Sequence, residues 1–142
     1  MYDAATALGE AATLSQRVRA VSGDRVLVPA TLREGKRGTL EQYARGPDLR
    51  VDAYPTEAGT ADVAGLRERL DDDVAMVYAE TPTTCGAIEA DLAAIGEAGV
   101  LGLGTAYGMG LGLFVTREES LRQVPGRLVG AGEDATGRRA TR

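Results

Sequence analysis

Apolar residues recur along this chain with two alternating spacings, one typical of helices and the other typical of strands. In residues 3–21 small and aliphatic side chains recur at helical spacing, with Asp3 as a good N-cap and Gly23 as a plausible end signal. A short apolar run at 25–29 follows and ends at a proline. The pattern therefore predicts an amphipathic helix that leads into a buried strand.

The same succession of helix and strand repeats further along the chain. A polar loop that runs into a helix is predicted over 33–47. Further helices are predicted over 61–70, 87–99 and 117–124, and a turn over 81–86. Strands are predicted over 49–55, 74–78 and 111–116. Strands that alternate with helices are typical of βαβ units, so the predicted fold class is α/β with a largely parallel sheet flanked by helices.

Two of these elements carry a specific expectation about their faces. Strict alternation in the strand over 49–55 predicts that it is half-buried, with Tyr54 on the solvent side. The helix over 87–99 is expected to have one apolar face. The residues expected on that face are Ile88, Leu92 and Ile95.

The composition fits one domain with a core of small aliphatic side chains. The chain has 142 residues, of which 44% are hydrophobic and only 4% aromatic. A chain of this length buries about two thirds of its surface on folding. Residues 130–142 contain no apolar side chain larger than alanine. We therefore expect a domain over 1–129 and a flexible tail over 130–142.

Charge and cysteine usage exclude several classes of function. The net charge is −5, whereas nucleic-acid binding needs a basic surface. No apolar stretch is long enough to span a membrane, and residues 1–10 do not resemble a secretory signal. The single Cys85 forms no internal disulfide. These features predict a cytoplasmic protein that binds neither nucleic acid nor membrane.

The chain contains no histidine, which removes the usual general base, zinc ligand and triad member. We accordingly predict no catalytic residue and no metal site. The one lysine, Lys36, lies between two glycines and beside Arg37, so we expect it in an exposed loop. A lysine that forms a Schiff base normally lies in an apolar pocket, so Lys36 is not expected to hold a cofactor covalently.

Four segments are candidates for binding. The glycine-rich stretch 101–116 follows a helix and runs into a strand, which is the reverse of a dinucleotide fingerprint, so a close-packed turn is favoured. The helix that begins at Asp3 offers free N–H groups to a phosphate, and the alternative is an ordinary capped helix. The polar turn in 77–86 follows the end of a strand, which is where ligands bind in open α/β sheets. The alternative is that this turn only connects a strand to a helix. Arg122 and Arg127 flank a Pro-Gly turn that could hold an anion or be solvated.

Three segments together resemble one known family. They are YDAATALGEAA at 2–12, VYAETPTTCGAIEADLAAIG at 77–96, and LGLGTAYGMGLGLFVTREESLRQVPGRLVGAGEDATGRRA at 101–140. They are similar to subunit 1 of the P-protein of the glycine cleavage system, glycine dehydrogenase (decarboxylating). The acidic, lysine-poor composition resembles the salt-adapted archaeal forms.

The resemblance implies part of the large domain of a fold type I pyridoxal-phosphate-dependent transferase. In this family the enzyme decarboxylates glycine and transfers the aminomethyl group to the lipoyl arm of the H-protein. The resemblance also implies a heterotetramer whose subunit 2 carries the Schiff-base lysine and the covalently held pyridoxal phosphate, with this chain as the non-catalytic partner. The residues expected near the cofactor are Asp3, Thr6, Thr83, Thr84 and Tyr107, and Arg127 is expected at the partner surface.

The chain also departs from the family pattern. Ala4 stands where the family has glycine. The resemblance also leads us to expect that the family's regions before and after the matched segments are absent from this chain. The predicted helix ending at Gly99 runs almost directly into residue 101, where the family has a further strand and loop. We therefore expect a truncated and internally deleted chain, inactive alone. The alternatives are a stand-alone module that binds a phosphate ligand and a remnant without function.

Overall fold

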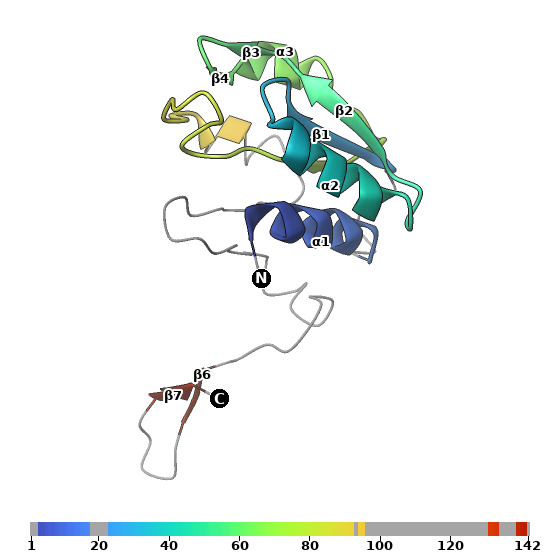
Figure 1. Ribbon diagram of the computed structural model, residues 1–142, viewed down its shortest axis with the longest axis vertical. Coiled ribbons are helices and arrows are strands. Elements are labelled where there is room, and N and C mark those ends of the chain that lie inside the picture. Colours follow the sequence, from blue (N-terminus) through green and yellow to red (C-terminus); the bar gives the residue numbers. More distant parts are fainter. Residues whose placement is uncertain (1–2, 18–22, 93, 96–130, 134–138, 142) are drawn as a thin grey trace.

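The computed structural model describes residues 3–17, 23–92, 94–95, 131–133 and 139–141 (Figure 1). Its main sheet has three parallel strands in the order β2-β1-β5. The strands are β1 (Arg25–Pro29), β2 (Arg50–Tyr54) and β5 (Val74–Val77). The predicted α/β class with a parallel sheet flanked by helices is confirmed.

Helices cover both faces of this sheet. The chain passes from β1 to β2 through α2 (Glu34–Ala44), and from β2 back across β1 to β5 through α3 (Val63–Arg67). Because the two crossovers run in opposite directions and such connections are right-handed, their helices lie on opposite faces. Helix α1 (Ala4–Arg17) packs beside α2 (Figure 1).

Among the described residues, two apolar clusters form the core, one on each face of the sheet. Under α1 and α2, the cluster includes Leu8, Leu40, Val26 and Val28. Under α3, Leu66 packs with side chains from the opposite face of the sheet. Every residue of β5 is buried, as is β1 from its second residue on, because both strands are covered on both faces.

Burial on both faces also explains why the prediction for Tyr54 was wrong. Its side chain is 1% exposed and packs in the α3-side cluster with Leu27 and Leu66. The alternation in β2 distinguishes two sides of the strand, but α3 covers the side that we expected to face solvent. A local pattern does not reveal which helix later covers a strand.

The segment that follows β5 differs from the predicted helix over 87–99. Residues 87–91 are not helical, and Ile88 is 69% exposed. The backbone N–H of Glu89 donates to the Thr81 hydroxyl at 3.1 Å, and the Glu89 carboxylate accepts from the N–H of Ala61 at 2.7 Å. Such bonds compete with those of a helix, so helical backbone is described only at 92 and 94–95.

The other strands in the described part of the chain form two small sheets. β3 (Thr56–Glu57) and β4 (Thr60–Ala61) pair through a turn with positive φ at Ala58 and Gly59. β6 (Ala131–Glu133) pairs with β7 (Arg139–Thr141). The second pair lies within the expected tail, whose flexibility and boundary at 130 stay predictions. The glycine-rich stretch and the elements predicted over 111–116 and 117–124 lie outside the described residues.

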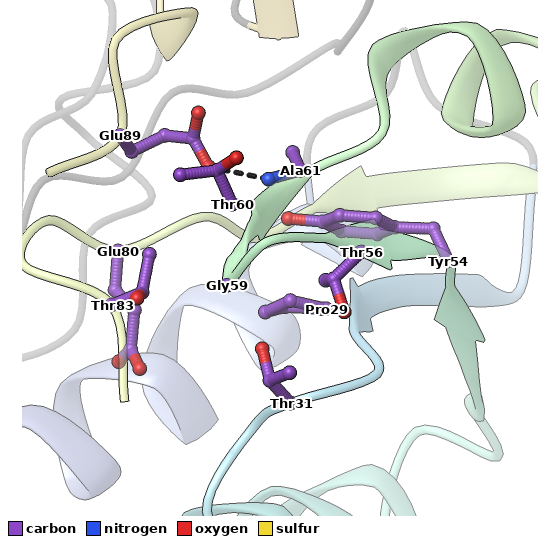
Figure 2. Close-up of a pocket in the computed structure, with 10 residues that line it drawn as sticks. All are labelled: Pro29, Thr31, Tyr54, Thr56, Gly59, Thr60, Ala61, Glu80, Thr83 and Glu89. Atoms are coloured by element: carbon purple, nitrogen blue, oxygen red, sulfur yellow. Dashed lines mark hydrogen bonds between the residues drawn. The ribbon is translucent and has the colours of Figure 1, made fainter. Parts of the chain in front are cut away.

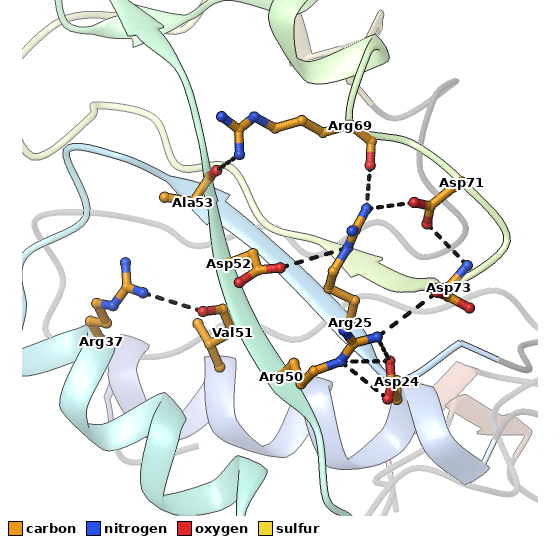
Figure 3. A network of polar contacts seen from close by, with 10 residues as sticks. All are labelled: Asp24, Arg25, Arg37, Arg50, Val51, Asp52, Ala53, Arg69, Asp71 and Asp73. Carbon is orange, nitrogen blue, oxygen red and sulfur yellow. Dashed lines mark hydrogen bonds and ion pairs between the residues drawn. The ribbon is translucent and has the colours of Figure 1, made fainter.

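Arginine–aspartate contacts join the amino ends of the three strands (Figure 3). Arg50, at the start of β2, contacts both carboxylate oxygens of Asp24, the nearer at 2.6 Å. Arg25, at the start of β1, donates to Asp71 at 3.0 Å.

Two other arginines bind the backbone of β2. Arg37 donates to the carbonyl oxygen of Val51 at 3.2 Å, and Arg69 donates to that of Ala53 at 2.9 Å. These contacts satisfy backbone acceptors of a strand at the end of the described sheet.

Candidate functional site

The strand order reverses between β1 and β5, and at such a point the carboxyl ends of parallel strands leave a crevice where ligands bind. A cavity lies at this edge (Figure 2). Its volume is about 10 Å³, which is about the space that one water molecule needs. The residues that line it are Pro29, Thr31, Tyr54, Thr56, Gly59, Thr60, Ala61, Glu80, Thr83 and Glu89.

Glu80 is the centre of a buried polar cluster at this edge. Its side chain is 1% exposed, and its Oε2 atom accepts from Lys36 Nζ at 2.5 Å and from the Tyr78 hydroxyl at 2.9 Å. Its Oε1 atom accepts from the Thr84 hydroxyl at 2.6 Å. Glu80 therefore connects α2, the end of β5 and the turn that follows.

Burial acts to raise the pKa of the Glu80 carboxyl, because it disfavours the charged form. The hydrogen bonds from Lys36, Thr84 and Tyr78, together with the lysine charge, outweigh burial and hold that pKa below its ordinary value. The carboxylate is therefore ionised at neutral pH in spite of its burial.

The prediction that Lys36 lies in an exposed loop was wrong. Lys36 lies in the first turn of α2, and its side chain is 10% exposed. The aliphatic stem is buried while the ammonium meets Glu80, so the cost of burying the charge is offset by a partner. Sequence analysis also missed Glu80. The sequence does contain a signal for this contact. Glu80 follows a buried strand, and Lys36 comes early in a crossover helix. Both positions lie at the carboxyl edge of a parallel sheet.

Tyr54 also lines the cavity (Figure 2) and makes a further buried polar contact at this edge. The Tyr54 hydroxyl donates to the carbonyl oxygen of Tyr78 at 2.9 Å. Burial raises the pKa of Tyr54, and the charges of Glu89 and Glu80 raise it further. Tyr54 therefore stays protonated and holds the end of β2 to the end of β5.

Asp3 and Thr6 cap α1 by bonding to each other. The Asp3 carboxylate accepts from the Thr6 backbone N–H at 2.7 Å, and the Thr6 hydroxyl oxygen accepts from the Asp3 N–H at 3.2 Å. The bond from the Thr6 backbone N–H is the main cause that lowers the pKa of Asp3. The structure thus describes a capped helix, and phosphate binding at this end stays a prediction. Gln16, near the other end of α1, donates to the carbonyl of Gly23 just before β1. The Asp3 end therefore lies toward the carboxyl edge.

Thr83 and Thr84 lie at the same edge, in the turn after β5 that contains the cis peptide bond between Thr81 and Pro82. The backbone N–H of Thr83 donates to the carbonyl of Ala87 at 2.8 Å, which closes the turn. The structure therefore brings Thr83 and Thr84 together with Glu80. Tyr107, Arg122 and Arg127 lie outside the described residues.

The described residues contain neither a candidate metal site nor a membrane-spanning helix. No group of three or more histidine, cysteine or acidic side chains in that part of the chain is placed to hold a metal ion. No helix there is long and apolar enough to cross a membrane.

The fold and the crevice define a class of protein: an open, doubly wound α/β domain with its candidate site at the carboxyl edge. Within this class, residues 72–142 match the model of the glycine cleavage system P-protein. The chain belongs to that family.

Named relatives agree with this assignment. The chain is 46% identical to the probable glycine dehydrogenase (decarboxylating) subunit 1 of Halobacterium salinarum, over 99% of this chain and 40% of the relative. For the protein of the same name in Carboxydothermus hydrogenoformans the identity is 32%, over 98% of this chain and 39% of the relative. A crystal structure of glycine decarboxylase (P-protein) of the glycine cleavage system, in inhibitor-bound form, matches with a TM-score of 0.73 and 25% identity. The match to this crystal structure covers 99% of this chain and 39% of the chain in the crystal structure.

The resemblance read from the sequence, including the likeness to a salt-adapted archaeal form, is thus confirmed. The chain spans about 40% of the length of the relatives that it matches. The match to the Halobacterium protein extends over 175 residues, at least 33 more than the 142 of this chain. Residues present in the relative are therefore missing from this chain. Their expected place, between Gly99 and residue 101, stays a prediction.

Proposed function

We propose that this chain is a fragment of the non-catalytic subunit of the glycine decarboxylase P-protein. The observation that supports this proposal best is the match to subunit 1 of the Halobacterium enzyme over 99% of the chain. In the proposed assembly, the complete enzyme decarboxylates glycine and transfers the aminomethyl group to the lipoyl arm of the H-protein. The fragment is inactive alone and works in the cytoplasm.

The enzyme family depends on pyridoxal phosphate, which supplies an electron sink for decarboxylation when it is bound. The residues of this chain do not fit covalent attachment of that group. Its one lysine is buried in the ion pair with Glu80, and the cavity beside that pair has room for about one water molecule. We therefore propose that subunit 2 supplies the Schiff-base lysine and holds the cofactor in a heterotetramer.

The role of this chain is to complete the surface around a cofactor that the partner holds. Asp3, Thr6, Thr83 and Thr84 are the proposed contacts, and their common place at the carboxyl edge supports grouping them. Tyr107 is a further proposed contact. Arg127 is proposed to face the partner subunit.

Co-purification tests this proposal. The chain is co-expressed in high salt with subunit 2 of the Halobacterium enzyme, and the absorbance of pyridoxal phosphate and the release of CO2 from glycine with H-protein are measured. Complete subunit 1 in place of the chain is the positive control, and subunit 2 alone is the negative control. A complex that carries cofactor and releases CO2 above the level of subunit 2 alone supports the proposal.

The missing residues favour one alternative, a remnant that no longer assembles. A chain that neither binds subunit 2 nor unfolds cooperatively would establish the remnant and exclude the proposed subunit. A chain that unfolds cooperatively as a monomer but does not bind subunit 2 would instead favour a stand-alone module.

A further inference from the structure

We propose that a hollow between Arg33 and the turn after β5 binds a small oxyanion, a carboxylate or a phosphate, through the Arg33 guanidinium. The hollow has a volume of about 270 Å³. The residues that line it are Arg33, Pro82, Thr83, Thr84 and Gly86. We call it the Arg33 hollow. The proposal concerns this chain alone and does not depend on the proposed assembly with subunit 2.

The charge of the lining points to an anion. Arg33 is its single charged residue, and no carboxylate belongs to it. Within the described part of the chain, Arg33 makes no side-chain hydrogen bond or ion pair, whereas Arg25 and Arg50 each contact an aspartate. An exposed guanidinium without an acidic partner presents a planar fork of N–H donors. That fork matches the two oxygens of a carboxylate or phosphate.

One hydroxyl group of the turn, that of Thr83, agrees with this interpretation. The Thr83 hydroxyl oxygen accepts from the Ala87 N–H at 3.3 Å, so its hydrogen remains available to an anion. Thr84 donates its own hydrogen to Glu80, and the charge of that carboxylate is balanced by Lys36. The charge of Glu80, which is bonded to a lining residue, is thus balanced by Lys36 and does not cancel the charge of Arg33.

Size and place limit the ligand. A volume of about 270 Å³ is just below the range of about 300–1,000 Å³ that is usual for drug-sized ligands, so the ligand has few heavy atoms. The hollow lies at the carboxyl edge of the parallel sheet, beside the point where the strand order reverses. Gly86 leaves the approach open, because a side chain added there would meet nothing within 4 Å.

A titration of the full chain followed by NMR tests the proposal. Sodium phosphate and sodium acetate are added in separate series, and the ionic strength is kept constant with sodium chloride so that screening does not change. We expect saturable shifts of the backbone amides of Thr83, Thr84 and Gly86 with at least one anion. The series that saturates distinguishes a phosphate ligand from a carboxylate.

Two variants make the test specific. Arg33→Gln should weaken the binding of that anion about 10- to 100-fold, the range expected for losing a charged hydrogen-bond donor. Arg45→Gln, at another exposed arginine at the end of α2, should leave the affinity unchanged. The proposal is overturned if neither anion saturates, if Arg33→Gln binds as tightly as the parent chain, or if the shifts map to the arginines at the amino ends of the strands.

Discussion

Lys36 Nζ lies 2.5 Å from Oε2 of Glu80, although the two residues are 44 positions apart along the chain. The contact joins the first turn of α2 to the segment that follows β5, at the carboxyl edge of the sheet. Because the Glu80 side chain is 1% exposed, its charge depends on this partner and on the hydroxyls of Tyr78 and Thr84. The pair is the main electrostatic support of the candidate site.

Lys36→Met should destabilise the fold, because it keeps the volume of the stem and leaves the Glu80 carboxylate buried without its cation. We expect a loss of about 3–5 kcal/mol in the free energy of unfolding, measured by urea denaturation. Arg45→Met, at an exposed arginine directly after the same helix, is the control and should change the free energy of unfolding by less than about 0.5 kcal/mol. A loss below about 1 kcal/mol in Lys36→Met would show that the pair does not support the fold.

The double variant Lys36→Met/Glu80→Gln tests whether the two residues act as a pair. Removing both charges leaves no ion buried without a partner, so the double variant should be more stable than the sum of the two single changes predicts. We expect a coupling of about 1–3 kcal/mol, obtained from the four unfolding curves. Additive losses would indicate that Lys36 and Glu80 contribute independently.

Acid should weaken the fold through Glu80. Because the folded-state pKa of Glu80 lies below its ordinary value of 4.5, its contribution to stability is present above that value. The contribution is lost as the pH falls through the lower folded-state pKa. The midpoint of urea unfolding should therefore fall on going below pH 4.5.

The same titration in Glu80→Gln isolates this residue from other carboxyl groups with lowered pKa, such as Asp3 and Asp24. The variant should be less stable at neutral pH and should lose less stability in acid. Parallel pH profiles for the two proteins would assign the acid sensitivity to the other groups.

Gly9 is required where α1 packs on α2. A Cβ atom at Gly9 would lie 2.5 Å from two ring carbons of Tyr43. Gly9→Ala should lower the thermal midpoint, although alanine favours a helix by about 1 kcal/mol over glycine. Gly38→Ala is the matched control, because nothing lies within 4 Å of its added methyl group, and it should raise the midpoint. Equal effects at the two glycines would contradict close packing of the helices.

Tyr54→Phe removes the hydroxyl that holds β2 to the end of β5. The carbonyl of Tyr78 would lose a donor in a buried place, so we expect a loss of about 1 kcal/mol in the free energy of unfolding. Hydrogen exchange of the amides at the carboxyl edge should speed up as well. Unchanged stability and exchange would show that another group replaces the hydroxyl.

The strands of the sheet could be predicted because their signal is local. The apolar runs around Val26 and Val74 identify buried strands, and their spacing with helices predicts parallel pairing. The position of Lys36 could not be predicted from neighbours alone, because two flanking glycines and an arginine favour a loop. Its burial depends on Glu80, which only the folded topology brings near.

The same limit applies to Tyr54 and Ile88. Alternation along β2 is real, but the coverage of its second face by α3 depends on the order of the strands. Ile88 has helical spacing to Leu92, yet hydrogen bonds of Glu89 to β4 and to Thr81 keep residues 87–91 out of a helix. In both cases a contact distant in sequence overrides a correct local periodicity.

The burial of the only lysine gives the chain a chemical reporter of its own motion. An acylating reagent that attacks side-chain amines has one target, and Glu80 holds that ammonium inside the fold. Modification of Lys36 therefore requires the carboxyl edge to open, and at neutral pH its rate follows the free energy of that local opening. A ligand or partner that closes the edge would slow acylation by the factor 1 + [L]/Kd, so the rate would report its affinity.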